Sequence, residues 1–200
     1  MSRIIAGSVG GRRIRMPSGR NTRPTTDRVR EAIFSAVAAW AGTADRPPEQ
    51  ALAGLAFGDL YAGSGAVGLE AASRGAHPVL LVEQDRATAS LIRRNAAELG
   101  LAVTVRLGDV RALIRQPAAP GLDVVFADPP YDLPTPALEA LLADLDAHGW
   151  LTPSALVVLE RSRRTPAPAW PATVTTTWSR AYGETTVYFG VRVPAEEVGP

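Results

Sequence analysis

The feature that most constrains the fold is a regular alternation of strand-like and helix-like segments through the middle of the chain. Short apolar runs of strand length lie at 55–60, 79–83, 103–107, 122–127 and 155–160. Segments with helical spacing of apolar residues separate them, at 66–74, 86–99, 110–115 and 137–148. Strands joined through helices run parallel and are covered on both faces. The sequence therefore predicts an α/β fold around a mostly parallel sheet.

The two ends of the chain carry different patterns. Beyond residue 160 the helical pattern stops, and two segments rich in Thr and Val, at 172–180 and 185–193, are predicted to pair as antiparallel strands. Near the start, glycines separate the two halves of a smaller predicted hairpin, and a helix is predicted to begin near residues 25–27. We expect one domain in three parts: a basic hairpin and helix at 1–50, the main part at 51–194 and a tail at 195–200.

Composition excludes several classes of site. The chain has 200 residues, 46% hydrophobic and 20% charged, which is an ordinary globular balance. It has no cysteine, which excludes disulfides and a cysteine nucleophile, and with only two histidines we expect no metal site. No apolar run approaches the length of about eighteen residues that a membrane span needs, and the N-terminus lacks a signal-peptide core. We therefore expect a cytoplasmic protein without a membrane partner.

The positive charge is concentrated at the N-terminus. The net charge is only +1, yet the first thirty residues carry eight arginines and one acid, Asp27. Such a block is typical of an arm that binds a polyanion, and the alternative is a solvated hairpin. Arg28 and Arg30 are set apart because they lie on the predicted helix. The arginines expected to contact RNA phosphates are Arg3, Arg12, Arg13, Arg15, Arg20 and Arg23.

A glycine-rich loop follows the first strand of the predicted sheet. Gly63, Gly65 and Gly68 have the spacing G-x-G-x-x-G, which permits a tight turn and close approach of a ligand to the backbone. Tyr61 and Ser64 belong to the same loop, and we expect all five residues in a nucleotide-type cofactor site. The spacing alone is also compatible with NAD.

Carboxylates near this loop favour a cationic cofactor. Asp59, at the end of the strand, would repel a pyrophosphate but suits the ammonium and sulfonium of S-adenosylmethionine. Glu83, twenty residues beyond Gly63, is placed to accept hydrogen bonds from ribose hydroxyls. Asp109 and Val110 are expected to meet an adenine ring. The alternatives are a loop cap for Asp59, a surface carboxylate for Glu83 and a helix N-cap for Asp109.

The fourth strand ends in a stiff loop, Asp128-Pro129-Pro130-Tyr131. Consecutive prolines fix φ and remove two backbone donors, so the carbonyls of this loop stay available as acceptors. Asp128 and the Pro129 carbonyl are suited to take the two N–H groups of an exocyclic base amine, and Tyr131 to stack on the base. Holding the amine in this way is a form of catalysis by positioning. The alternative is a rigid turn without function.

These motifs resemble a known family. The Asp-Pro-Pro-Tyr loop and the glycine loop look like those of class I amino-methyltransferases. The segments RPTTDRVRE at 23–31, DLYAGSG at 59–65 and GLEA at 68–71 resemble, more narrowly, the RsmD family of bacterial 16S rRNA guanine-N2 methyltransferases. The resemblance runs from Arg3 to about Val193. The stretches 117–121 and 165–171 follow none of the family's motifs.

The resemblance implies a class I methyltransferase (Rossmann-like) fold with a seven-stranded sheet and an antiparallel C-terminal hairpin. It implies S-adenosyl-L-methionine as cofactor and, as partner, 16S rRNA within the small ribosomal subunit; we expect a monomer. Three other functions fit part of the pattern. An adenine-N6 DNA or RNA methyltransferase or a protein-glutamine methyltransferase shares the catalytic loop, an NAD-linked oxidoreductase fits the glycine loop alone, and a non-catalytic RNA-binding module fits the arm alone.

Overall fold

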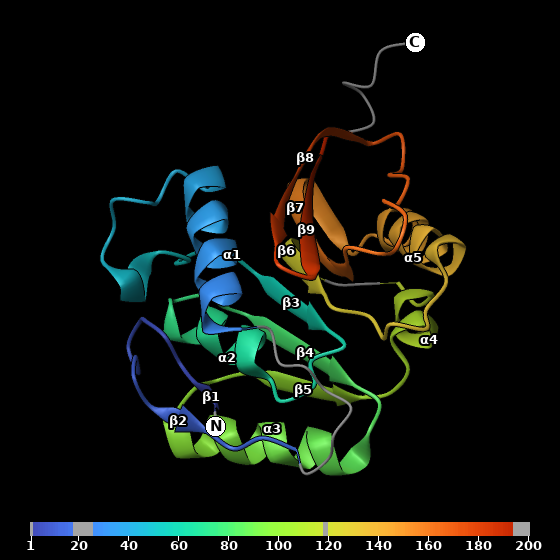
Figure 1. The fold of residues 1–200 in the computed structure, drawn as a ribbon. Helices are drawn as coiled ribbons and strands as arrows, with labels where there is room; N and C mark the ends of the chain where they lie inside the picture. The colour runs from blue at the N-terminus through green and yellow to red at the C-terminus, as the bar shows by residue number, and fades with distance from the viewer. Residues whose placement is uncertain (1, 18–25, 118–119, 194–200) are drawn as a thin grey trace.

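The computed structural model describes residues 2–17, 26–117 and 120–193, and its centre is a seven-stranded sheet in the order β5-β4-β3-β6-β7-β9-β8 (Figure 1). Five strands run parallel: β3 (Phe57–Leu60), β4 (Val79–Glu83), β5 (Thr104–Leu107), β6 (Leu122–Ala127) and β7 (Leu151–Ser162). Two strands at one edge pair antiparallel: β8 (Val174–Tyr182) and β9 (Thr185–Arg192). The chain order reverses between β4 and β6 on either side of β3. This arrangement confirms the predicted class I methyltransferase fold.

Helices cover both faces of the sheet. They are α1 (Asp27–Trp40), α2 (Ala66–Ser73), α3 (Arg86–Leu99), α4 (Val110–Ile114) and α5 (Thr135–Ala147), with a 3-10 turn η1 (Pro48–Gln50). Alternate residues of β6 enter different clusters: Val124 packs in the cluster with α1, α2 and α3, and Val125 in the cluster with α4 and α5. No helix within the described ranges is long and apolar enough to cross a membrane.

The starts of four helices (α1, α2, α3 and α4) and the bounds of β4 and β6 match the sequence predictions, whereas α5, predicted at 137–148, begins at Thr135. Thr26 caps α1 by accepting a hydrogen bond from the Val29 amide, and Asp85 caps α3 through the Thr88 amide. The main difference is β7, which the pattern placed at 155–160 and which spans Leu151–Ser162. The additional residues pair with distant partners, since Leu151 lies opposite Leu122 and Ser162 opposite Thr185. Such pairing depends on tertiary contacts and leaves little trace in a local pattern.

The N-terminal arm, residues 2–17, lies against α2 and α3 (Figure 1). Its ends pair as two short antiparallel strands, β1 (Ser2–Arg3) and β2 (Arg13–Ile14). Ile4 is fully buried and packs with Leu69 of α2 and Leu99 of α3. Gly7 has φ +89°, and a Cβ there would stand 2.1 Å from the Ser73 carbonyl oxygen. The arm is therefore packed onto the main part of the molecule.

Candidate active site

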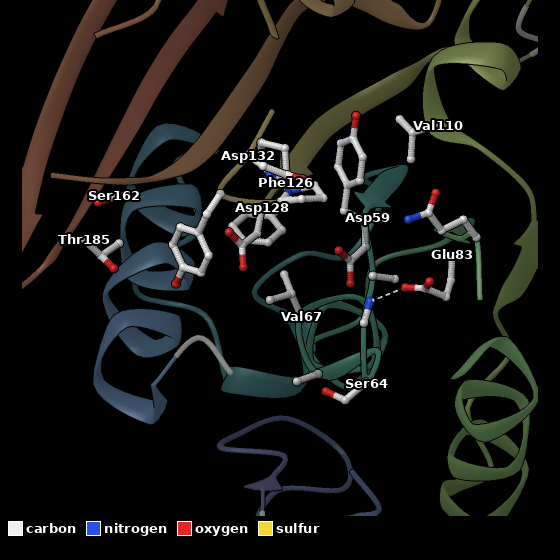
Figure 2. Close-up of a pocket in the computed structure, with 18 of the residues that line it drawn as sticks. Asp59, Ser64, Val67, Glu83, Val110, Phe126, Asp128, Asp132, Ser162 and Thr185 are labelled. Carbon is white, nitrogen blue, oxygen red and sulfur yellow. Dashed lines mark hydrogen bonds between the residues drawn. The ribbon is translucent and has the colours of Figure 1, made fainter. Parts of the chain in front are cut away.

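A cleft of about 1010 Å³ opens at the carboxyl ends of β3, β4 and β6 (Figure 2). Ligands bind at this edge in open α/β sheets, where the strand order reverses. Ten predicted site residues line the cleft: Asp59, Tyr61, Gly63, Ser64, Glu83, Val110, Asp128, Pro129, Pro130 and Tyr131. The topology thus brings together the glycine loop and the Asp-Pro-Pro-Tyr loop, which are about sixty residues apart in sequence.

The glycine loop turns sharply between β3 and α2. Tyr61, Gly63 and Gly65 have positive φ values of 65°, 53° and 80°, and Gly65 is the N-cap of α2. Gly68 has no room for a side chain, because a Cβ would lie 2.6 Å from the Leu81 side chain. Gly65 and Gly68 do not line the cleft. They shape the loop, whereas Gly63 and Ser64 face the cleft.

Asp59 is the most deeply buried carboxyl group of the cleft, with 1% of its surface exposed. Its Oδ2 accepts a hydrogen bond of 2.7 Å from the Gly68 amide, which fixes the first turn of α2. Burial raises the pKa of Asp59 to about 7; the Gly68 hydrogen bond opposes the rise and the charge of Glu83 adds to it. The loop-capping role is therefore present, and the same group also faces the cleft.

Glu83 braces the loop from the end of β4. Its Oε2 accepts a hydrogen bond of 2.9 Å from the Gly63 amide (Figure 2). Its Oε1 accepts one of 2.8 Å from the Asp85 amide. Asp109 accepts a hydrogen bond of 2.9 Å from the Ala112 amide as N-cap of α4, and it lies outside the cleft lining. Its neighbour Val110 is buried and lines the cleft. The N-cap alternative for Asp109 is thus realised, and the adenine contact stays a prediction.

The Asp-Pro-Pro-Tyr loop forms the opposite wall. The pKa of the Asp128 carboxyl is raised well above its usual value by burial and by the charges of Glu160 and Asp59, and Arg161 opposes this. Tyr131 is 62% exposed at the mouth of the cleft. The loop is held from β7, since Arg161 Nη2 donates to the carbonyl of Leu133 at 2.9 Å. A half-buried carboxyl acceptor and an exposed aromatic ring therefore belong to one short loop and line the same cleft.

Sequence reasoning missed the outer wall of the cleft. It is lined by Ser162, the last residue of β7, by Arg164 just beyond it, and by Glu184 and Thr185 at the β8–β9 turn. The turn itself was predicted, but its place depends on antiparallel pairing of β7 with β9. Met16 of the arm also lines the cleft. The remaining lining residues that were not predicted are Ala62, Ala66, Val67, Gln84, Phe126 and Asp132.

Most described arginines of the arm contact the protein itself. Arg3 pairs with Asp27 at 3.3 Å and Arg15 with Glu98 at 2.7 Å. Arg12 donates to the carbonyls of Glu98 and Leu99 at the end of α3. The Arg13 side chain is exposed and forms no hydrogen bond or ion pair with another described residue. Arg20 and Arg23 lie outside the described residues.

Arg30, which the sequence set apart, is fully buried in α1. It donates to Asp27 at 2.7 Å, to the Arg3 carbonyl at 2.7 Å and to Ser2 Oγ at 3.2 Å. Burial lowers the pKa of Arg30, and the charges of Glu70 and Asp27 oppose this. Arg30 therefore fastens the start of the arm to α1, and it does not line the cleft.

The cleft suits a positively charged organic ligand. Asp59 and Glu83 line its glycine-loop wall, so a cation there would find compensating carboxylates. The buried Tyr61 hydroxyl has no hydrogen-bond partner among the described residues, and Tyr61 also lines the cleft. Within the described part of the chain, no group of three or more His, Asp or Glu side chains is placed to hold a metal ion. The carboxylates and the Tyr61 hydroxyl of the cleft thus suit a cationic nucleoside better than a metal ion.

Comparisons with known proteins agree with this geometry. Residues 2–191 match the family model described as conserved hypothetical protein 95. The chain is 37% identical over 172 residues to Ribosomal RNA small subunit methyltransferase D of Escherichia coli K12, covering 85% of this chain and 79% of that protein. The solved structure of Escherichia coli yhhF has a TM-score of 0.81 at 32% identity, covering 96% and 98% of the two chains. An RNA methyltransferase from Salinibacter ruber in complex with S-adenosyl-L-homocysteine shares the fold, with a TM-score of 0.59 at 20% identity over 88% and 99%.

Proposed function

The chain belongs to the RsmD family, and on that premise we propose that it is an S-adenosylmethionine-dependent methyltransferase of ribosomal RNA that modifies the exocyclic N2 of a guanine in 16S rRNA. The observation that carries the proposal is the pairing of two walls in one cleft. One wall holds carboxylates suited to a cationic nucleoside, and the other holds Asp128 beside the exposed ring of Tyr131. We infer that the protein acts as a monomer on the assembled small subunit.

The cofactor would be held by the glycine-loop wall. Asp59 would face the cationic amino-acid end, and Glu83 the ribose hydroxyls, while its bonds to the Gly63 and Asp85 amides keep its carboxylate in place. Val110 would pack on the adenine, with Asp109 accepting from the adenine amine. S-adenosylmethionine supplies an electrophilic methyl group on its sulfonium sulfur. The buried, carboxylate-lined setting favours a cation over the neutral or anionic nucleotides that an oxidoreductase would bind.

The opposite wall would orient the base. The Asp128 carboxylate and the Pro129 carbonyl each accept one N–H of the guanine amine, and the Tyr131 ring stacks on the base. Two acceptors on one amine direct the nitrogen lone pair toward the methyl group. Bond formation at N2 accompanies loss of the sulfonium C–S bond, and one N2 proton then leaves to Asp128 or to water. Turning the guanine out of its stack costs a few kcal/mol, and less for an unpaired base.

The test is a transfer assay with methyl-labelled S-adenosylmethionine and two substrates, naked 16S rRNA and small subunits that lack the modification. RNA is digested and the labelled nucleoside identified by mass spectrometry. The expected product is N2-methylguanosine, formed faster on small subunits. N6-methyladenosine would replace the guanine assignment by the adenine one. Absence of label from both substrates, in a protein that binds S-adenosylmethionine, would overturn the RNA assignment.

A further inference from the structure

One buried side chain joins the arm to the glycine loop. Asn95 of α3 is 1% exposed and lies between Arg15 of the arm and Ser64 of the loop. Its Oδ1 accepts from the Arg15 amide at 3.0 Å, and its Nδ2 donates to the Arg15 carbonyl at 3.0 Å. The same Nδ2 donates to the Ser64 carbonyl at 3.4 Å. Both donor hydrogens of the amide are therefore used, one for each segment.

Both segments that Asn95 holds belong to the wall of the cleft. Ser64 lines it directly, and Met16, the residue after Arg15, lines it from the arm. A shift of Ser64 would change the hydrogen bond to Asn95, and through it the position of Arg15 and Met16. The bond to Ser64, at 3.4 Å, is longer than the usual N–H···O distance of about 2.7–3.2 Å, so a small displacement of the loop breaks or strengthens it. Because the amide is buried, losing either partner leaves an unsatisfied polar group.

The other described anchors of the arm lie away from the glycine loop. Glu70 of α2 accepts from the amides of Ile5 and Ala6 at 2.6 and 2.9 Å. Ser73 donates to the Ala6 carbonyl at 2.7 Å and accepts from the Val9 amide at 3.2 Å. Neither side chain lines the cleft. Among the contacts of the described residues, the Asn95 amide is thus the polar connection between arm and loop.

We propose that Asn95 is a positioning residue that couples the cofactor loop to the N-terminal arm, so that a ligand in the cleft orders the arm and a docked arm strengthens ligand binding. Such coupling is reciprocal for equilibrium binding. The inference rests on the proposed function in one respect, since it takes S-adenosylmethionine and its product S-adenosylhomocysteine as ligands of the cleft. If the arm also binds rRNA, cofactor and RNA then bind cooperatively through this side chain.

The test uses amide hydrogen exchange in the full-length protein with and without S-adenosylhomocysteine. The reporters are amides within the arm hairpin, which keep their own partners in every variant: Ile4, Gly11 and Arg12. In the wild type, ligand at about 100 Kd is expected to slow their exchange several-fold, with a ceiling of about 100-fold if the arm opens only after release. In Asn95→Ala the ligand effect is expected to fall below about twofold. In the matched control Ser73→Ala, basal exchange rises and the ligand effect persists.

Steady-state kinetics provide a second readout. Asn95→Ala is expected to raise KM for S-adenosylmethionine while kcat changes little, because Asn95 contacts the loop and not the reacting atoms. Should Asn95→Ala not fold, Asn95→Asp keeps the acceptor for the Arg15 amide, removes both donors and is expected to lose the ligand effect. A full ligand effect in either folded Asn95 variant would overturn the inference. Failure of the wild type to bind S-adenosylhomocysteine in calorimetry would instead overturn the cofactor assignment itself.

Discussion

At the scale of single residues, Asp59 has a structural role that requires burial and a binding role that requires a charge, and burial disfavours the charge. Its hydrogen bond to the Gly68 amide shapes the cofactor loop, and its burial disfavours the carboxylate form that a cation needs. Ionising this group in the absence of a ligand therefore costs folding free energy. A cation in the cleft would recover part of that cost, which makes Asp59 a group whose charge serves binding more than stability.

The pH dependence of stability should expose this cost. Because the folded pKa of about 7 lies above the usual 3.8, Asp59 takes up protons on folding and its contribution is lost as pH rises from about 4 through 7. Asp59→Asn keeps an acceptor for Gly68 but cannot ionise. In urea unfolding at pH 8, we expect the free energy of unfolding of the variant to exceed that of the wild type by at most about 4 kcal/mol. This difference in free energy should shrink to zero toward pH 4.

The same substitution should act in the opposite direction on the ligand. Asp59→Asn is expected to bind S-adenosylmethionine more weakly at pH 8, because the cation loses its carboxylate. Urea unfolding and cofactor affinity, measured on the same variant, distinguish an effect of the lost charge from an effect of disturbed packing. A variant that is less stable than the wild type at pH 8, or one that binds the cofactor with unchanged affinity, would contradict the role given to Asp59.

Asp128 and Tyr131 should affect chemistry and leave cofactor binding intact. Asp128→Ala removes one of the two acceptors of the amine, and we expect most methyl transfer to be lost, with S-adenosylmethionine affinity nearly unchanged in calorimetry. Tyr131→Ala should also impair transfer. The matched control is Tyr131→Phe, which keeps the ring and should be milder. Equal damage from Tyr131→Phe and Tyr131→Ala would exclude stacking as the function of the ring.

At the scale of elements, predictability follows how local the determinants are. Strands β4 and β6 were predicted to the residue, because each is a short apolar run between turn signals. The facing loops of the cleft were also predictable, since parallel strands bring their carboxyl ends to one edge. Thr185 and Met16 were not, because their place depends on the pairing of β7 with β9 and on docking of the arm. Contacts between distant elements leave no periodicity in the sequence.

The partners of the arm's arginines also could not be predicted, because the sequence shows these arginines only as one basic block. The structure divides them by partner, since Arg12 donates to carbonyls at the end of α3, Arg15 pairs with Glu98 and Arg13 is exposed. Arg12 and Arg15 therefore have a structural use besides any contact with phosphate. A combined replacement of all three would mix the loss of docking with the loss of RNA contacts.

Single replacements in the arm should separate these two effects. Arg13→Ala is expected to leave urea unfolding unchanged and to weaken binding to small subunits, with the salt slope reduced by about 0.7–1 for one phosphate contact. Arg12→Ala is the matched comparison, and it should lower stability by about 1.5–3 kcal/mol through loss of charged hydrogen bonds. If Arg13→Ala binds small subunits with the original affinity and salt slope, Arg13 is a solvated residue of the hairpin.

At the scale of the whole molecule, we propose that the arm and the main part form one cooperative unit. Ile4 and Ile14 of the arm are buried against α2 and α3, and the fully buried Glu70 is satisfied by two arm amides and by Arg74. Without the arm, Glu70 would lose two hydrogen bonds and keep its ion pair with Arg74. Such a loss is among the costliest single events in a fold. The arm is therefore expected to unfold with the rest and not before it.

Replacing Ile4 by Ala tests whether the arm and the rest of the molecule unfold in one cooperative transition. All four tryptophans lie outside the arm, at 40, 150, 170 and 178, so their fluorescence reports α1 and the main part but not the arm itself. We expect Ile4→Ala to lower the free energy of unfolding seen by this fluorescence by about 2–5 kcal/mol, with one transition and an unchanged m-value. Leu107→Ala, on a residue 40% exposed, should change it by less than about 0.5 kcal/mol. An unchanged tryptophan transition in a folded Ile4→Ala protein would make the arm an independent appendage.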